Sequence, residues 1–190
     1  MTNKTGQALT HVADDGSARM VDVSAKSDTA RMARATGAIA MSAGTLKAIV
    51  ANTVAKGDVL AVARLAGIMA AKRTADLIPL CHPIALTDVA VTLRADADLP
   101  GVRVEAIART TGKTGVEMEA LTAVTVALLT VYDMAKALDR GMTLMDVTLA
   151  EKTGGASGDY ARLDGMSVAP YTQGAGELDT IRNPLPGFDL

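Results

Sequence analysis

The sequence predicts an α+β fold in which α-helices cover one antiparallel β-sheet. Residues 85–95 and 102–106 alternate apolar with small or polar side chains around a Leu-Pro-Gly turn at 99–101, so they predict a hairpin. The long apolar run at 116–138 has the length of a helix rather than of a strand. Helices followed by a hairpin, another helix and a strand form an order typical of this fold class.

The first part of the chain is expected to contribute two strands after a flexible start. Residues 1 to about 19 are polar and contain an Asp-Asp-Gly turn signal, so no regular structure is expected there. Residues 20–23 alternate in the manner of a short strand, and the small and apolar residues at 35–41 favour a second strand.

Two helices are predicted next. Residues 42–52 place apolar side chains at helical spacing, which is typical of a short helix with one buried face. Asp58 is a good N-cap for a second helix, which runs from residue 59 toward residue 75 and has to stop before Pro79.

The last elements surround a glycine-rich loop. Gly141 follows the end of the long helix, residues 142–149 form a mostly apolar, strand-like run, and a loop rich in glycine occupies 152–159. Beyond Arg162 the composition shifts to Gly, Pro and polar residues, which favours a poorly packed tail. The expected organisation is a flexible segment at 1–19, a single domain at 20–160 and a flexible tail at 161–190.

Composition and charge exclude several classes of protein. A net charge of −2 gives no global basic field, which argues against a nucleic-acid partner. Cys81 is the single cysteine, so an internal disulfide and a multi-cysteine zinc or iron–sulfur site are excluded. The start of the chain lacks a hydrophobic signal region, and no apolar run reaches membrane-spanning length without a charge. We therefore expect a cytoplasmic protein with no membrane partner.

The apolar residues of the chain are mostly small. There are one Phe, three Tyr and no Trp, so Ala, Val, Leu and Met supply most of the core. Because each small side chain buries little area, such a core gains from further burial between subunits. We therefore expect a homo-oligomer.

The long helix carries ionisable groups near both ends. At about 100° per residue, Glu119 and Asp133 point within about 40° of each other, yet they lie about 21 Å apart along the axis. Either a long ligand spans them or each end serves a different site. Asp133 and Lys136 are compatible with an ordinary i,i+3 ion pair or with a general acid–base pair in a crevice. Glu117 and Glu119 are equally compatible with simple complementation of the helix dipole.

The segment Leu80-Cys81-His82-Pro83 is predicted to be a loop on a rigid frame, between a helix and a strand. His82 is a candidate to bind a ligand, to carry a proton or to cap a turn, and a lone histidine is more often structural. A Cys81–His82 nucleophile is disfavoured, because adjacent residues rarely form such a pair and no third group is present to orient them.

A partial phosphate-loop sequence precedes the long helix. Residues 111–115 read Thr-Gly-Lys-Thr-Gly, but Ile107 stands where the full motif needs a glycine, so a nucleoside triphosphatase is disfavoured. Glycine amides and a lysine before a helix N-terminus still suit an anion. No spacing of His, Asp and Glu makes a convincing metal site. Further cations stand where phosphate could be bound, although each alone is more typical of a solvated surface charge: Lys26, Arg31, Lys56, Lys72, Arg73 and Lys152.

Several ordered blocks of sequence stand out when the whole chain is considered. They are Met20-Val21-Asp22-Val23-Ser24-Ala25-Lys26, Lys56-Gly57-Asp58-Val59, Ala70-Ala71-Lys72-Arg73-Thr74, Asp76-Leu77-Ile78-Pro79-Leu80-Cys81-His82-Pro83, Thr111-Gly112-Lys113-Thr114-Gly115-Val116-Glu117-Met118-Glu119-Ala120 and Tyr132-Asp133-Met134. Together they closely resemble the cyclic pyranopterin monophosphate synthase family of molybdenum-cofactor biosynthesis, the MoaC proteins. The similarity covers about residues 20–159, which argues strongly against chance.

The resemblance implies an activity, a fold and an assembly. Proteins of this family convert 3′,8-cyclo-7,8-dihydro-GTP into cyclic pyranopterin monophosphate and release pyrophosphate, which makes them phosphorus–oxygen lyases. Their fold is a ferredoxin-like α+β sandwich, assembled as a hexamer (a trimer of dimers) with sites at the dimer interface. The implied partner is a small nucleotide or pterin substrate. No cofactor is assigned, and whether Mg²⁺ accompanies the triphosphate stays open.

The matching motifs also imply roles for single residues. The catalytic pair would be Asp133, as the assigned active-site residue, and Lys136, as its companion acid or base. The residues expected to bind the substrate are Leu80, Cys81, His82, Met118, Glu119, Glu117, Lys56, Lys152, Arg31 and Lys26.

Ala156 departs from the family pattern, because the glycine loop of the family often reads Gly-Gly-Lys-Ser-Gly. A phosphate contact from position 156 is therefore absent, although Lys152 remains. A second hypothesis, a non-catalytic oligomer that binds a pterin or a nucleotide, stays open on this ground. Retention of Asp133, Lys136 and His82 favours the enzyme, because binding alone would tolerate loss of the acid–base pair.

Overall fold

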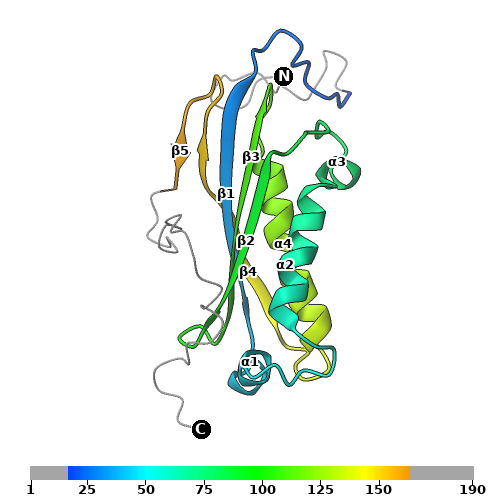
Figure 1. The fold of residues 1–190 in the computed structure, drawn as a ribbon, viewed down its shortest axis with the longest axis vertical. Coiled ribbons are helices and arrows are strands. Elements are labelled where there is room, and N and C mark those ends of the chain that lie inside the picture. Colours follow the sequence, from blue (N-terminus) through cyan, green and yellow to red (C-terminus); the bar gives the residue numbers. More distant parts are fainter. Residues whose placement is uncertain (1–16, 163–190) are drawn as a thin grey trace.

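The computed structural model describes residues 17–162 (Figure 1). The flexible segments expected at the two ends lie largely outside this range, at residues 1–16 and 163–190. The elements, in chain order, are β1 (Thr29–Ala40), α1 (Ala43–Val50), α2 (Val59–Ala71), α3 (Thr74–Leu77), β2 (Asp88–Asp96), β3 (Gly101–Gly112), α4 (Glu117–Ala135), β4 (Thr143–Thr153) and β5 (Tyr160–Ala161).

The strands form one antiparallel sheet in the order β2-β3-β1-β4-β5. β1 lies at the centre, paired with β3 on one side and with β4 on the other. The predicted hairpin is confirmed, since β2 and β3 are adjacent and antiparallel. α2 and α4 pack against each other and cover one face of the sheet (Figure 1). The fold is therefore the expected α+β sandwich of ferredoxin-like kind.

The core lies between the sheet and the two long helices, and it consists mainly of small side chains. α4 is long and apolar enough to span a membrane by length and composition alone. In this fold its apolar side chains are instead buried against the sheet and α2, among them Ala120, Ala123, Val124, Ala127, Leu128 and Val131. The hydropathy of α4 is thus that of a central core helix.

Local signals placed the starts of the helices correctly. The Asp58 carboxylate accepts a hydrogen bond from the Ala61 amide at 2.9 Å, which confirms it as the N-cap of α2. α2 nevertheless ends at Ala71 rather than near residue 75, and α3 is a separate turn. At the start of this turn the Thr74 hydroxyl donates to the Ala71 carbonyl at 3.0 Å.

The strand predictions were less accurate. Residues 20–23 form no strand, and the carbonyl of Val21 is bound by the His82 side chain instead of by a neighbouring strand. β1 begins at Thr29 rather than at residue 35, because its charged first half finds partners across the sheet: Arg34 pairs with Glu105 at 3.3 Å and with Glu151 at 3.2 Å. β4 extends to Thr153, and the short β5 was not expected.

Candidate active site

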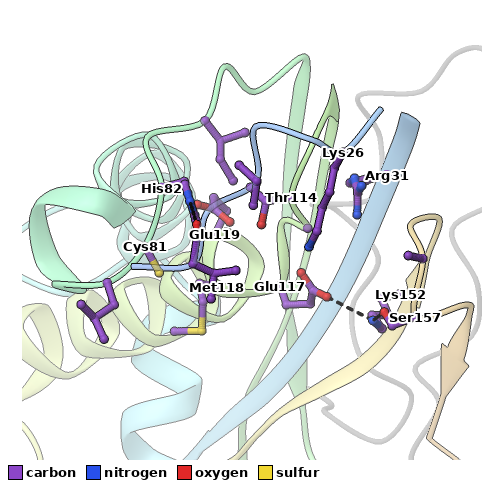
Figure 2. Close-up of a pocket in the computed structure, with 16 residues that line it drawn as sticks. Lys26, Arg31, Cys81, His82, Thr114, Glu117, Met118, Glu119, Lys152 and Ser157 are labelled. Atoms are coloured by element: carbon purple, nitrogen blue, oxygen red, sulfur yellow. Dashed lines mark hydrogen bonds and ion pairs between the residues drawn. The ribbon is translucent and has the colours of Figure 1, made fainter. Parts of the chain in front are cut away.

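One cavity of about 700 Å³ opens at the end of the sheet where α4 begins (Figure 2). Its walls come from four parts of the chain: the segment before β1 with the start of β1, the loop after α3, the segment after β3 with the start of α4, and the end of β4 with the glycine loop. It gathers most of the residues expected to bind the substrate, namely Lys26, Arg31, Leu80, Cys81, His82, Glu117, Met118, Glu119 and Lys152.

One side of the cavity is cationic. Arg31 is fixed by a hydrogen bond from its Nε to the Gly112 carbonyl at 2.8 Å. Lys152 Nζ lies 2.6 Å from Ser157 Oγ and 3.5 Å from a Glu117 carboxylate oxygen. Lys26 is the third cation that lines this space (Figure 2). Three positive side chains are thus held around one cavity in a chain whose net charge is negative, which suits a polyanionic ligand.

The glycine loop is shaped to fit against Arg31. Gly154 and Gly155 both adopt positive φ, at 85° and 88°, a region that residues with a Cβ rarely enter. A Cβ at Gly155 would also collide with the Arg31 guanidinium. Gly155 therefore allows the loop to close directly onto this cation, while Ala156 and Ser157 line the cavity.

The other side of the cavity contains a buried carboxyl group. Glu119 is only 3% exposed, and burial, with a smaller contribution from the charge of Glu117, raises its pKa to about 7. Burial, together with the charge of Glu119, also raises the pKa of the Cys81 thiol, which makes this thiol a poor nucleophile. A carboxyl group that titrates near neutral pH in a cavity is a candidate for proton exchange with a ligand.

His82 has a defined partner in the same wall. Its Nε2 lies 2.7 Å from the Val21 carbonyl oxygen. Because a carbonyl oxygen only accepts hydrogen bonds, Nε2 must carry the proton in this contact. Val21, Val23 and Ile84 also line the cavity. They had not been singled out as site residues, since uncharged side chains give no chemical signal in the sequence.

A second cluster lies at the opposite end of α4. The Asp133 carboxylate accepts from Lys136 Nζ at 2.6 Å and from Lys56 Nζ at 2.8 Å. Lys56 also donates to the Asp133 backbone carbonyl at 2.8 Å. The hydrogen bonds from Lys136 and then Lys56 lower the pKa of Asp133 to about 2, although its side chain is 58% exposed. This group therefore stays ionised at neutral pH.

The two clusters do not meet within one chain. Glu119 and Asp133 are about 21 Å apart along α4 at the helical rise per residue. Lys56 and Lys136 both pair with Asp133. None of these three residues lines the cavity described above. Within residues 17–162, no group of three or more His, Cys, Asp or Glu side chains lies close enough to hold a metal ion.

Comparisons with known proteins identify the family of the chain. The MoaC family matches residues 20–155. Three relatives share the name cyclic pyranopterin monophosphate synthase. The protein from Brucella melitensis biotype 2 is 58% identical over 160 residues, which are 84% of this chain and 97% of the relative. The protein from Parvibaculum lavamentivorans is 61% identical over 152 residues, which are 80% of this chain and 95% of the relative. The protein from Dinoroseobacter shibae is 62% identical over 152 residues, which are 80% of this chain and 96% of the relative.

Proposed function

The chain belongs to the MoaC family, and on that premise we propose that it is a cyclic pyranopterin monophosphate synthase of molybdenum-cofactor biosynthesis. It converts 3′,8-cyclo-7,8-dihydro-GTP into cyclic pyranopterin monophosphate and releases pyrophosphate. The relatives support the reaction, since all three carry the name of this enzyme and the match to this chain covers nearly their whole length. The observation in this structure that best supports it is the two-sided cavity, cationic on one side and carrying a buried carboxyl group on the other.

The cavity fits the two halves of such a substrate. Lys26, Arg31 and Lys152 supply the positive charge that a triphosphate needs, and the Arg31 guanidinium adds planar donors suited to phosphate oxygens. Glu119 is placed to accept hydrogen bonds from the ring N–H and amino groups of the guanine-derived part. The proposal assigns no resident cofactor, and a Mg²⁺ ion that accompanies the triphosphate would enter with the substrate.

We assign the catalytic role to the Asp133 cluster, which consists of Asp133, Lys136 and Lys56. Asp133 remains a carboxylate at neutral pH, so its role is to orient the two lysines rather than to take up a proton. The reaction forms a cyclic phosphate when a substrate hydroxyl attacks the innermost phosphorus and the bond to the departing pyrophosphate breaks. Lysine ammonium groups near that phosphorus would stabilise the charge that develops on the phosphate oxygens.

We propose that one copy of the chain completes the site of another. Within one chain the Asp133 cluster and the cavity are too far apart to act on the same atoms. The cluster is also well exposed, as are the apolar side chains Val62, Leu65, Met69 and Leu129 of α2 and α4. Assembly into a cytoplasmic hexamer, a trimer of dimers with sites at the dimer interface, accounts for both kinds of exposure.

The direct test supplies the cyclised GTP substrate and measures pyrophosphate and pterin product. Lys136→Ala removes a lysine that stabilises the developing charge, and Asp133→Asn removes the carboxylate that orients both lysines, so each is expected to lower turnover by at least about a hundredfold. Circular dichroism should show an unchanged fold, because all three side chains of the cluster are exposed to solvent.

Lys47→Ala is the matched control, since Lys47 is an exposed lysine on α1 outside both clusters. It should leave turnover unchanged. Near-normal turnover in both cluster variants would contradict the proposed mechanism, and no product from the unmodified protein would contradict the proposed reaction.

A further inference from the structure

A short segment without regular structure crosses the cavity just before β1. We call residues 20–28 the strap. Its residues Val21, Val23 and Lys26 line the cavity beside the residues expected to bind the substrate (Figure 2). A turn within it, closed by a hydrogen bond from the Lys26 amide to the Val23 carbonyl at 3.0 Å, sets the direction in which Lys26 leaves the strap.

Two side chains from other parts of the fold bind the backbone of the strap. His82, on the loop after α3, donates to the Val21 carbonyl over 2.7 Å. Lys113, between β3 and α4, donates from Nζ to the Ser24 carbonyl over 2.8 Å. Both contacts precede Lys26, while the pairing of β1 with β3 begins at Thr29. Lys26 therefore lies on a short stretch of chain that is fixed on both sides.

The positions of the two contacts connect the strap to the rest of the cavity. His82 belongs to the same loop as Cys81, and Lys113 precedes the first turn of α4, which carries Glu117 and Glu119. The strap thus contacts two segments beside the cavity: the loop after α3, through His82, and the segment between β3 and α4, through Lys113. His82 Nε2 is occupied by the Val21 carbonyl, so this nitrogen is not available as a donor to a ligand while the strap is in place.

We propose that His82 and Lys113 are positioning residues, which fasten the strap over the cavity and so hold Lys26 where it can bind the triphosphate. Lys113 itself does not line the cavity, so its effect on the substrate has to pass through the strap. The two hydrogen bonds that hold the strap are present in the protein without substrate. Its consequence for substrate binding rests on the proposed function.

Limited proteolysis with trypsin measures the fastening without any substrate. Cleavage after Lys26 requires the strap to leave the cavity, so its rate reports how often the strap opens. His82→Phe and Lys113→Met each remove one hydrogen-bond donor, and each should speed this cleavage by about three- to tenfold. His82→Gln keeps an N–H donor at a similar reach and should stay within about twofold of the unmodified protein.

Lys47→Met, on α1, is the control for general loosening and should not change the rate. Thermal unfolding of each variant shows whether the whole fold is intact. Unchanged cleavage after Lys26 in both His82→Phe and Lys113→Met would overturn the proposal, as would a His82→Gln rate equal to that of His82→Phe.

The consequence for the reaction is tested with Lys113, which is outside the cavity. Lys113→Met should raise KM severalfold with little change in kcat. In a Lys26→Met background the same substitution should have no further effect on KM, because its action passes through Lys26. A full effect of Lys113→Met in that background would overturn the positioning role. A protein without turnover would contradict the proposed function and leave the proteolysis result valid.

Discussion

Glu119 and Asp133 show how the surroundings of single residues set their chemistry on one helix. Glu119 is buried at the start of α4, and loss of hydration raises its pKa to about 7. Asp133 is exposed near the end of the same helix, and hydrogen bonds from two lysines lower its pKa to about 2. At neutral pH the first group can exchange a proton, while the second remains a fixed negative charge.

The raised pKa of Glu119 predicts that the protein loses stability as pH rises. The folded state holds the Glu119 proton more tightly than the unfolded state, so the stabilisation is complete below about pH 4.5 and is lost as pH rises through about 7. Glu119→Gln imitates the protonated form. At pH 8 it should therefore be more stable than the unmodified protein by up to roughly 3 kcal/mol, with little difference near pH 5. Urea unfolding at the two pH values measures this.

Asp76→Asn, which removes an exposed carboxyl group on α3, is the control for loss of a carboxyl group that is not buried. A stability gain for Glu119→Gln of the same size at pH 5 and pH 8 would contradict the explanation by burial.

At the scale of elements, small residues let α2 and α4 lie close together. Gly67 of α2 faces α4, and a Cβ at this position would lie 2.9 Å from the Ala123 carbonyl oxygen and 3.3 Å from the Ala127 Cβ. The first contact is with backbone, which cannot rotate away. The close contact of the two helices, and with it the position of both ends of α4, depends on this glycine.

Substitution of two helical glycines should therefore have opposite effects. Gly67→Ala is expected to destabilise the protein by about 1–2 kcal/mol, because the overpacking cost exceeds the gain in helix propensity. Gly44→Ala, on the exposed side of α1 with no atom within 4 Å of the new Cβ, should instead stabilise it by about 0.5 kcal/mol. Thermal or urea unfolding of the two variants is the measurement. Equal effects of the same sign would mean that the interhelical contact does not limit packing.

At the scale of the whole molecule, the two ends of α4 hold two different sets of functional groups. The start of α4 lies at the end of the fold near α3, and its other end lies near α1 (Figure 1). The cavity is lined by residues at the start of α4, while the Asp133 cluster lies near its other end. A helix of this length is rigid, so no local motion brings the two sets together. In the shared site proposed above, a second copy of the chain presents one set to the other.

Mixed assemblies test this arrangement directly. Arg31→Ala, in the cavity, and Lys136→Ala, in the cluster, are each expected to be nearly inactive. In mixed dimers with shared sites, one site combines an intact cavity with an intact cluster, so refolding the two variants together should restore about a quarter of normal activity. Mixing Lys136→Ala with Asp133→Asn, which alter the same cluster, should restore none. Absence of recovery in the first mixture would contradict a site shared between copies.

Much of the fold was predictable because its signals are local. The cap at Asp58 and the alternation on either side of the turn at 99–101 depend on residues close together in the chain, and the structure places elements there. The strand predictions failed where strand formation depends on pairing with segments far away in the sequence. Residues 20–23 alternate like a strand but have no strand beside them, while the charged start of β1 is a strand because β3 and β4 flank it.

The sequence by itself determined the family of this protein, the starts of its main helices and the separation of Glu119 from Asp133, since motifs, local start signals and helical rise are properties of consecutive residues. The tertiary structure alone decided that Lys56 joins Asp133, that the glycine loop closes on Arg31, and that His82 holds the strap. It also decided the charge states of the two acids. A pKa depends on burial and on neighbouring charges, and these come from segments that only folding brings together.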